Sequence, residues 1–187
     1  MKHLQVTKLV VLICLIFFSL TSCSKEEVGR DQDFAGITVS LKSDSGELNN
    51  VFLDIEDIQV KITEDDNASS AWMSLNTINT GSHNVSDLRG DTELLLVNHY
   101  EIKPTYIHEI RLVLGDNNFI NVNDMLVHLD VTEIGNAKPS NFVKKAFEGN
   151  HIYQVVINLD IDASVDFNAT ENMTVLNPKL YTQIRKF

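Results

Sequence analysis

Residues 152–161, with the sequence IYQVVINLDI, form the strongest strand pattern in the chain. Every second residue from Val155 to Ile161 is apolar, and the residues between them, such as Asn158 and Asp160, point to the opposite face of an extended strand. Such alternation is typical of a strand that packs one face on a core and exposes the other. The stretch therefore predicts an all-β core element.

Three further runs, all earlier in the chain, repeat this pattern. Ile37–Leu41 and Tyr106–Leu114 alternate regularly and predict two strands. Odd-numbered positions from 37 to 41 are expected to face inward in the first, and even-numbered positions from 110 to 114 in the second. Val51–Ile62 is longer, and its apolar positions change parity near Glu56 and Asp57. Because a change of parity would turn the apolar side chains to solvent, we expect a β-bulge there.

Shorter apolar runs complete the pattern, separated by clusters of Gly, Asn, Asp and Ser. The predicted strands are Trp72–Leu75, His83–Leu88, Met125–Val131, Phe142–Phe147 and Leu180–Arg185. Thr92–His99 is predicted to form a helix of one or two turns, with Asp91 as its N-cap. About eight or nine strands and one short helix indicate an all-β sandwich.

A family resemblance follows from the order of these runs. The chain resembles the bacterial lipoprotein family called domain of unknown function 4382 in the segments Gly36–Leu41, Val51–Lys61, Trp72–Leu75, Tyr106–Leu114, Leu159–Ala163 and Asn177–Leu180. The resemblance implies a Greek-key β-sandwich similar to transthyretin-like and carboxypeptidase-regulatory domains, which usually act as binding or assembly modules. It implies no catalytic residues. The chain departs from the family pattern between Asn121 and Phe147, so the strands of that segment stay open.

The amino terminus has the order of a secretion signal. Lys2 and Lys8 precede the apolar run Leu9–Leu20, which is shorter than the roughly 20 residues of a membrane-spanning helix. The following Ser22 and Cys23 complete a sequence that resembles the bacterial lipobox. The resemblance implies cleavage between these two residues and acylation of Cys23, which would anchor the protein to a membrane.

The residues after the predicted cleavage site suggest where the anchored protein faces. Ser24, Lys25, Glu26 and Glu27 resemble the signal that directs Bacteroidetes-type lipoproteins to the outer face of the outer membrane. The alternative is that they only form a solvated tether. We expect residues 1–22 to be a signal peptide, 23–35 a lipidated cysteine with a flexible tether, and 36–187 the β-sandwich domain.

Composition excludes several classes of protein. The chain of 187 residues has 15 Lys and Arg against 26 Asp and Glu, a net charge of −11, and it contains two cysteines. A strong excess of acid disfavours nucleic acid as a partner, because nucleic-acid binding depends on neutralising phosphates. Two cysteines make neither a disulfide framework nor a thiolate zinc site.

Motifs for catalysis are absent from the sequence. No G-x-S-x-G elbow, P-loop or G-x-G-x-x-G occurs, and His108-Glu109 is a chance match to a zinc-protease helix because position 112 is Leu. We therefore predict a protein that is not an enzyme. An extracellular hydrolase with an acidic site assembled from distant residues is the alternative.

One acidic group is a candidate for metal binding. Asp160, Asp162, Asp166 and Asn168 follow one another closely enough for their oxygens to meet around a calcium ion. The alternative is a solvated outer strand face. No other cofactor is expected.

These observations predict a lipid-anchored surface protein that binds an extracellular glycan or protein without catalysis. A second possibility is an adhesin or pilus subunit, in which processing at Arg30 exposes a sheet edge for strand addition.

Overall fold

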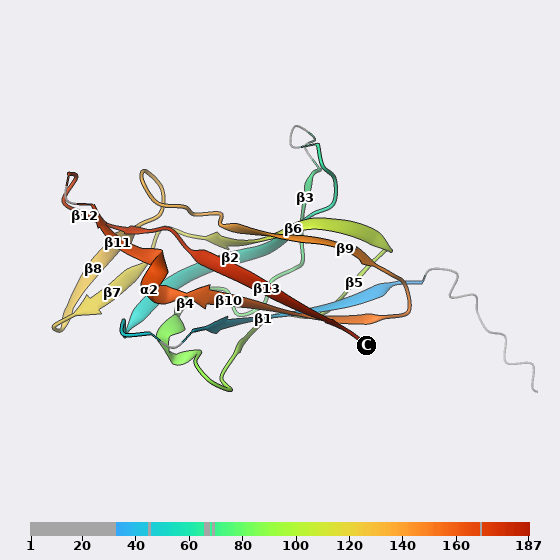
Figure 1. The fold of residues 1–187 in the computed structure, drawn as a ribbon, viewed down its shortest axis with the longest axis horizontal. Coiled ribbons are helices and arrows are strands. Elements are labelled where there is room, and N and C mark those ends of the chain that lie inside the picture. The colour runs from blue at the N-terminus through green and yellow to red at the C-terminus, as the bar shows by residue number, and fades with distance from the viewer. Residues whose placement is uncertain (1–32, 45, 66–67, 69, 169) are drawn as a thin grey trace, which may run out of the picture. The chain divides into compact units, whose positions relative to one another are not determined.

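The computed structural model describes residues 33–44, 46–65, 68, 70–168 and 170–187, which belong to a compact unit spanning Gln32–Phe187. The predicted signal peptide, Cys23, the segment 24–27 and Arg30 lie outside the described residues. The described part contains thirteen strands, one short 3-10 turn and one short α-helix, arranged as two sheets (Figure 1). The predicted all-β sandwich is therefore confirmed. Among the described residues, no helix is long and apolar enough to cross a membrane.

The smaller sheet has four strands. Its order is β13 (Lys179–Lys186), β10 (Ile152–Asp160), β1 (Ala35–Ser43) and β5 (Leu94–Ile102). β10 pairs with β1 in parallel and with β13 antiparallel, so the strongest strand of the sequence lies inside the sheet.

The larger sheet has nine strands. Its path is β11 (Val165–Asn168), β12 (Met173–Leu176), β8 (Met125–Asp130), β7 (Phe119–Val122), β2 (Val51–Lys61), β6 (Thr105–Leu114) and β9 (Ser140–Phe147), and β3 (Trp72–Ser74) and β4 (Gly81–Asn84) also pair with β2. Figure 1 shows β7, β8, β11 and β12 at one end of the unit, away from the C-terminus. The segment between Asn121 and Phe147, which the sequence left open, thus forms the end of β7 and all of β8 and β9.

Apolar residues from both sheets form one core. Ile37 of β1 and Tyr153 of β10 are fully buried, as are Leu53 of β2 and Leu112 of β6. The Tyr153 ring lies against Phe147 with centroids 4.2 Å apart. Burial of these alternating side chains from two sheets stabilises the sandwich.

The predicted bulge in β2 is confirmed. Ile55 pairs with Leu114, but Asp57 pairs with the adjacent Val113, so β2 contains one extra residue at Glu56. Both Ile55 and Ile58 are consequently buried, although their positions differ in parity.

The predicted helix at Thr92–His99, with Asp91 as N-cap, is wrong. Leu94–Ile102 is strand β5, which pairs with β1. Two register shifts interrupt this pairing, and His99 has a φ of 48°. These bulges place the consecutive residues Leu96 and Val97 in the core, which removes the alternation that marks a strand.

The remaining differences concern short elements. The predicted strand His83–Leu88 ends at Asn84 and continues as the 3-10 turn η1 (Val85–Asp87). The α-helix of the described residues is α2 (Ile161–Ser164), which Asp160 caps after β10. Strands β4, β7, β11 and β12 have four residues each, too few to show alternation, which explains why the structure has more strands than expected.

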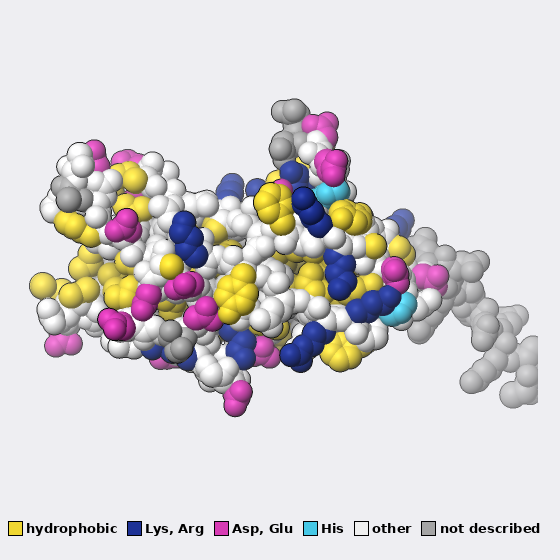
Figure 2. All heavy atoms as spheres, in the orientation of Figure 1, with side chains coloured by type: hydrophobic (Ala, Val, Ile, Leu, Met, Phe, Trp, Pro, Cys, Tyr) yellow, Lys and Arg dark blue, Asp and Glu magenta, His cyan; other side chains and the backbone are white. Residues whose placement is uncertain are grey.

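Charge is unevenly distributed over the folded unit. On the face shown in Figure 2, acidic side chains gather toward the end that carries β7, β8, β11 and β12, and Lys and Arg gather toward the opposite end.

Candidate functional site

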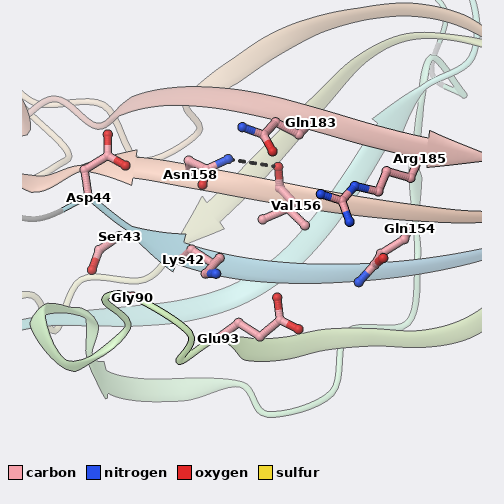
Figure 3. Close-up of a pocket in the computed structure, with 10 residues that line it drawn as sticks. All are labelled: Lys42, Ser43, Asp44, Gly90, Glu93, Gln154, Val156, Asn158, Gln183 and Arg185. Atoms are coloured by element: carbon pink, nitrogen blue, oxygen red, sulfur yellow. Dashed lines mark hydrogen bonds between the residues drawn. The ribbon is translucent and has the colours of Figure 1, made fainter.

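A polar groove lies on the outward face of the four-stranded sheet (Figure 3). Its volume is about 520 Å³, within the range of ligand pockets, which is roughly 300–1,000 Å³. The lining residues are Lys42, Ser43, Asp44, Gly90, Glu93, Gln154, Val156, Asn158, Gln183 and Arg185. Strands β1, β10 and β13 form the floor, and Glu93 points toward this floor from the segment before β5.

Strand pairing fixes the spacing of the side chains on the floor. Gln154 lies opposite Arg185, and Val156 lies opposite Gln183, on β10 and β13. Asn158 of β10 lies beside Lys42 of β1. Because paired residues on adjacent strands project to the same face, about 4.8 Å apart, these side chains form a regular two-dimensional array.

Hydrogen bonds hold several groups of the floor and the rim in place. The Tyr181 hydroxyl donates to the Asp44 carboxylate at 2.9 Å, and this hydrogen bond raises the pKa of the tyrosine. The Ser43 hydroxyl donates to the Val85 carbonyl at 2.7 Å. The Asn158 amide donates to the Val156 carbonyl at 3.4 Å, which leaves its side-chain oxygen available to accept from a ligand.

The chemistry of the groove is polar and balanced in charge. Three carboxamides, from Gln154, Asn158 and Gln183, each offer donors and an acceptor. The cations Lys42 and Arg185 are matched in number by the carboxylates of Asp44 and Glu93, and Val156 is the only aliphatic residue of the lining. This arrangement can satisfy a ligand with many hydroxyl groups, since each hydroxyl both donates and accepts.

The residues predicted to bind calcium accept hydrogen bonds from backbone N–H groups. Asp162 accepts hydrogen bonds from the N–H groups of Glu47 at 2.7 Å and Leu48 at 3.0 Å, and these bonds lower the pKa of its carboxyl. Asp160 accepts from the N–H of Ala163 at 3.0 Å and caps α2.

The other two candidates also make local hydrogen bonds. Asp166 accepts from the N–H of the next residue, and Asn168 accepts from the N–H groups of Thr170 and Glu171. Over the described part of the chain, no group of three or more His, Cys, Asp or Glu residues is placed to hold a metal ion. The calcium site therefore stays a prediction that this geometry does not support.

Trp72 and His108 lie on the other sheet, away from the groove. The Arg111 guanidinium stacks on the Trp72 ring, 3.9 Å from its centroid, and donates to Gln59. His108 contacts the Tyr106 ring edge-on and lies 3.7 Å from Glu64. These contacts stabilise the surface of the larger sheet and the loop that follows β2.

Comparison with protein-family models gives one match. The model described as "Domain of unknown function (DUF4382)" matches residues 35–178. The chain belongs to the DUF4382 family. No curated protein and no solved structure matches the chain.

The DUF4382 match covers most of the groove but ends just before β13. Lys42, Glu93 and Gln154 lie within the matched residues, whereas Gln183 and Arg185 lie beyond them.

Sequence reasoning had placed the outward residues of β10 on a solvated face and missed the groove. The signal that could have indicated the groove is the row of polar residues at outward-facing positions of two strands, which are Gln154, Asn158, Gln183 and Arg185. Alternation does not reveal that β1, β10 and β13 are neighbours, which is what brings these side chains together.

Proposed function

We propose that this DUF4382 protein is a lipid-anchored module of the cell surface that binds an extracellular glycan, without catalysis, through the groove on β1, β10 and β13. The observation that carries the proposal is the array of three carboxamides with balanced charges on a rigid sheet. Hydroxyl groups of a saccharide match such donors and acceptors, and fixed strand spacing orients them in advance.

Other ligand classes fit the groove less well. Protein interfaces depend on buried aromatic and apolar anchors, and the groove lining offers Val156 alone. Typical small-molecule pockets are mostly apolar. Phosphate-rich ligands need a net positive site, whereas Glu93 and Asp44 balance the cations here.

Anchoring is the second part of the proposal. The lipobox-like residues Ser22 and Cys23, followed by the segment 24–27, support attachment of the domain to the outer membrane with display toward the exterior.

Two of the four edge strands would accept an added strand poorly, which weighs against the adhesin or pilus alternative at those two edges. Edge strand β5 is bulged at His99, which has a φ of 48°, and edge strand β9 is bulged at Lys144, which has a φ of 47°. Bulges and edge lysines interrupt the regular row of backbone groups that an added strand needs.

Site-specific cross-linking on living cells tests the proposed function. A photoreactive benzoylphenylalanine replaces Gln183 in the groove or, as a matched control, Gln59 on the outward face of the other sheet. We expect illumination to give adducts only with the Gln183 replacement, and we expect acid hydrolysis of these adducts to release sugars. Equal adducts at both positions, or adducts that contain only polypeptide, would contradict the glycan assignment.

A further inference from the structure

Three exposed apolar side chains lie at the end of the domain where the described chain begins. Phe34 is 36% exposed, Ile152 46% and Phe187 67%. Ile152 and Phe187 exchange two backbone hydrogen bonds, of 2.8 and 3.2 Å, so they are neighbours on β10 and at the end of β13. Phe34 and Ile152 line the same shallow hollow, of about 230 Å³, with His99 and His151. We call Phe34, Ile152 and Phe187 the terminal patch.

The terminal patch lies next to the predicted tether. Phe34 directly follows residues 24–33, and ten residues span at most about 35 Å when fully extended. A lipid on Cys23 therefore keeps this end of the domain within a short distance of the bilayer. No other part of the described domain is tied so closely to the proposed anchor.

Charge distinguishes this end from the rest of the domain. The segments that form it, 33–36, 99–106, 144–153 and 184–187, contain five Lys or Arg and three Asp or Glu. The other described residues contain six Lys or Arg and 19 Asp or Glu. The same asymmetry is visible in Figure 2, where dark blue side chains gather toward the C-terminal end and magenta side chains toward the other.

We propose that the terminal patch and its surrounding cations form a membrane-contact surface, on which the domain rests end-on against the bilayer that carries its anchor. This inference rests on the anchoring at Cys23 that the proposed function includes. Aromatic and aliphatic side chains gain free energy when they enter the interfacial region, and nearby Lys and Arg are attracted to anionic headgroups. The acidic remainder of the domain is repelled from the same surface, which fixes the orientation.

The orientation has a consequence for the groove. Arg185, a groove residue, is two positions from Phe187 on the same strand face, so the groove begins beside the terminal patch. End-on contact would therefore hold the groove close to the membrane surface with its far end, at Lys42 and Glu93, directed away from it.

Fluorescence quenching in vesicles tests the contact surface. The full mature lipidated chain carries one added cysteine, Lys103→Cys beside the terminal patch or Leu126→Cys at the opposite end, labelled with an environment-sensitive dye. The vesicles contain phosphatidylcholine and phosphatidylglycerol, with a spin-labelled lipid as quencher. We expect strong quenching at position 103, little at position 126, and weaker quenching at position 103 when salt is raised.

Matched variants separate specific contact from tethering alone. Replacement of both aromatic residues, Phe34→Ser with Phe187→Ser, should lower the docking equilibrium constant about tenfold, which corresponds to loss of part of their burial. The control pair Val122→Ser with Met125→Ser removes exposed apolar side chains from the opposite end and should leave quenching unchanged.

Several outcomes would overturn the inference while leaving the glycan-binding proposal intact. The first is equal quenching at positions 103 and 126, and the second is quenching at position 103 that the two Phe→Ser changes do not alter. The third is a change in dye fluorescence at position 103 on addition of dextran but not of lipid, which would assign the terminal patch to the ligand of the groove. Retention of the protein in the vesicle fraction reports the anchor separately. Loss of retention would refute the anchor and, with it, the contact surface.

Discussion

Asp130 is a buried carboxylate that organises the loop after β8. Burial tends to raise its pKa, but hydrogen bonds from the backbone N–H groups of residues 132–134 outweigh burial and lower the pKa to about 2. The loop also closes tightly, since a Cβ added at Gly135 would overlap the backbone of Asp130 and Leu176.

Replacement of this carboxylate should destabilise the domain in a pH-dependent way. Because the pKa of Asp130 is lower in the folded state, its stabilisation is complete above the unfolded pKa of about 4 and is lost as the pH falls toward about 2. We expect Asp130→Asn to lower the free energy of unfolding by about 1–2 kcal/mol at pH 7. Denaturant titrations should show this difference shrinking between pH 4 and pH 2. A difference that is constant over this range would contradict the assignment.

Calcium should have no effect on stability if the four predicted calcium ligands only accept hydrogen bonds from the backbone. These residues are Asp160, Asp162, Asp166 and Asn168. We expect the same Tm in excess Ca²⁺ and in excess chelator, measured by differential scanning calorimetry. A Tm that rises with Ca²⁺ in the natural chain but not in Asp166→Ala would instead restore the calcium site. Asp166 is the suitable position because the hydrogen bond that it makes within the described part of the chain comes from the adjacent backbone N–H.

Cys23 is the residue on which the membrane assignment depends. We expect cells that produce the protein to incorporate labelled palmitate into it and to lose this label in Cys23→Ala. The matched variant Cys14→Ala, within the predicted signal peptide, should keep the label. Equal labelling of the natural chain and Cys23→Ala would refute the lipid anchor.

At the scale of single elements, regular strands were predictable, and an irregular strand was predictable only where a parity change in the sequence revealed its bulge. The apolar residues of β1 and β10 alternate in the sequence, and the parity change in β2 revealed its bulge. The register shift of β6 between Ile107 and Glu109 was missed, although β6 buries both Ile107 and Ile110, which differ in parity. β5 was mistaken for a helix because its two register shifts bury consecutive residues. A bulge depends on the partner strand, so the local pattern of β5 does not contain the information that identifies it.

The strand assignment of β5 makes a prediction about two adjacent leucines. Leu96 is fully buried, whereas Leu95 is only partly buried. We expect Leu96→Ala to lower the free energy of unfolding by about 2–5 kcal/mol, as core truncations do, and Leu95→Ala to have a clearly smaller effect. Equal losses in denaturant titrations would contradict the inward orientation of Leu96.

The groove could not be predicted from its separate strands, because it depends on which strands are neighbours. Each of its strands could be predicted, and so could the outward parity of Gln154 and Asn158. Pairing of β1 with β10 joins residues more than 100 positions apart, and this long-range parallel contact is set by packing of the whole sandwich rather than by local preference.

At the scale of the whole molecule, the domain is polarised in charge along its length. The end that carries Phe34 and Phe187 is mildly basic, and the end formed by β7, β8, β11 and β12 is strongly acidic (Figure 2). The groove lies on the flank between them. This arrangement suits a module that contacts a membrane at one end and a polar extracellular chain along its side.

Affinity electrophoresis of the full chain tests glycan binding by the groove most directly. Native gels contain dextran, mannan or xylan as neutral polysaccharides, or polygalacturonate as an acidic one. We expect a neutral polysaccharide to retard the natural protein and Gln59→Ala equally. The groove variant Gln183→Ala with Arg185→Ala should bind about tenfold more weakly, as expected for the loss of ligand hydrogen bonds. Equal retardation of the natural protein and the groove variant, or retardation by polygalacturonate alone, would contradict the account.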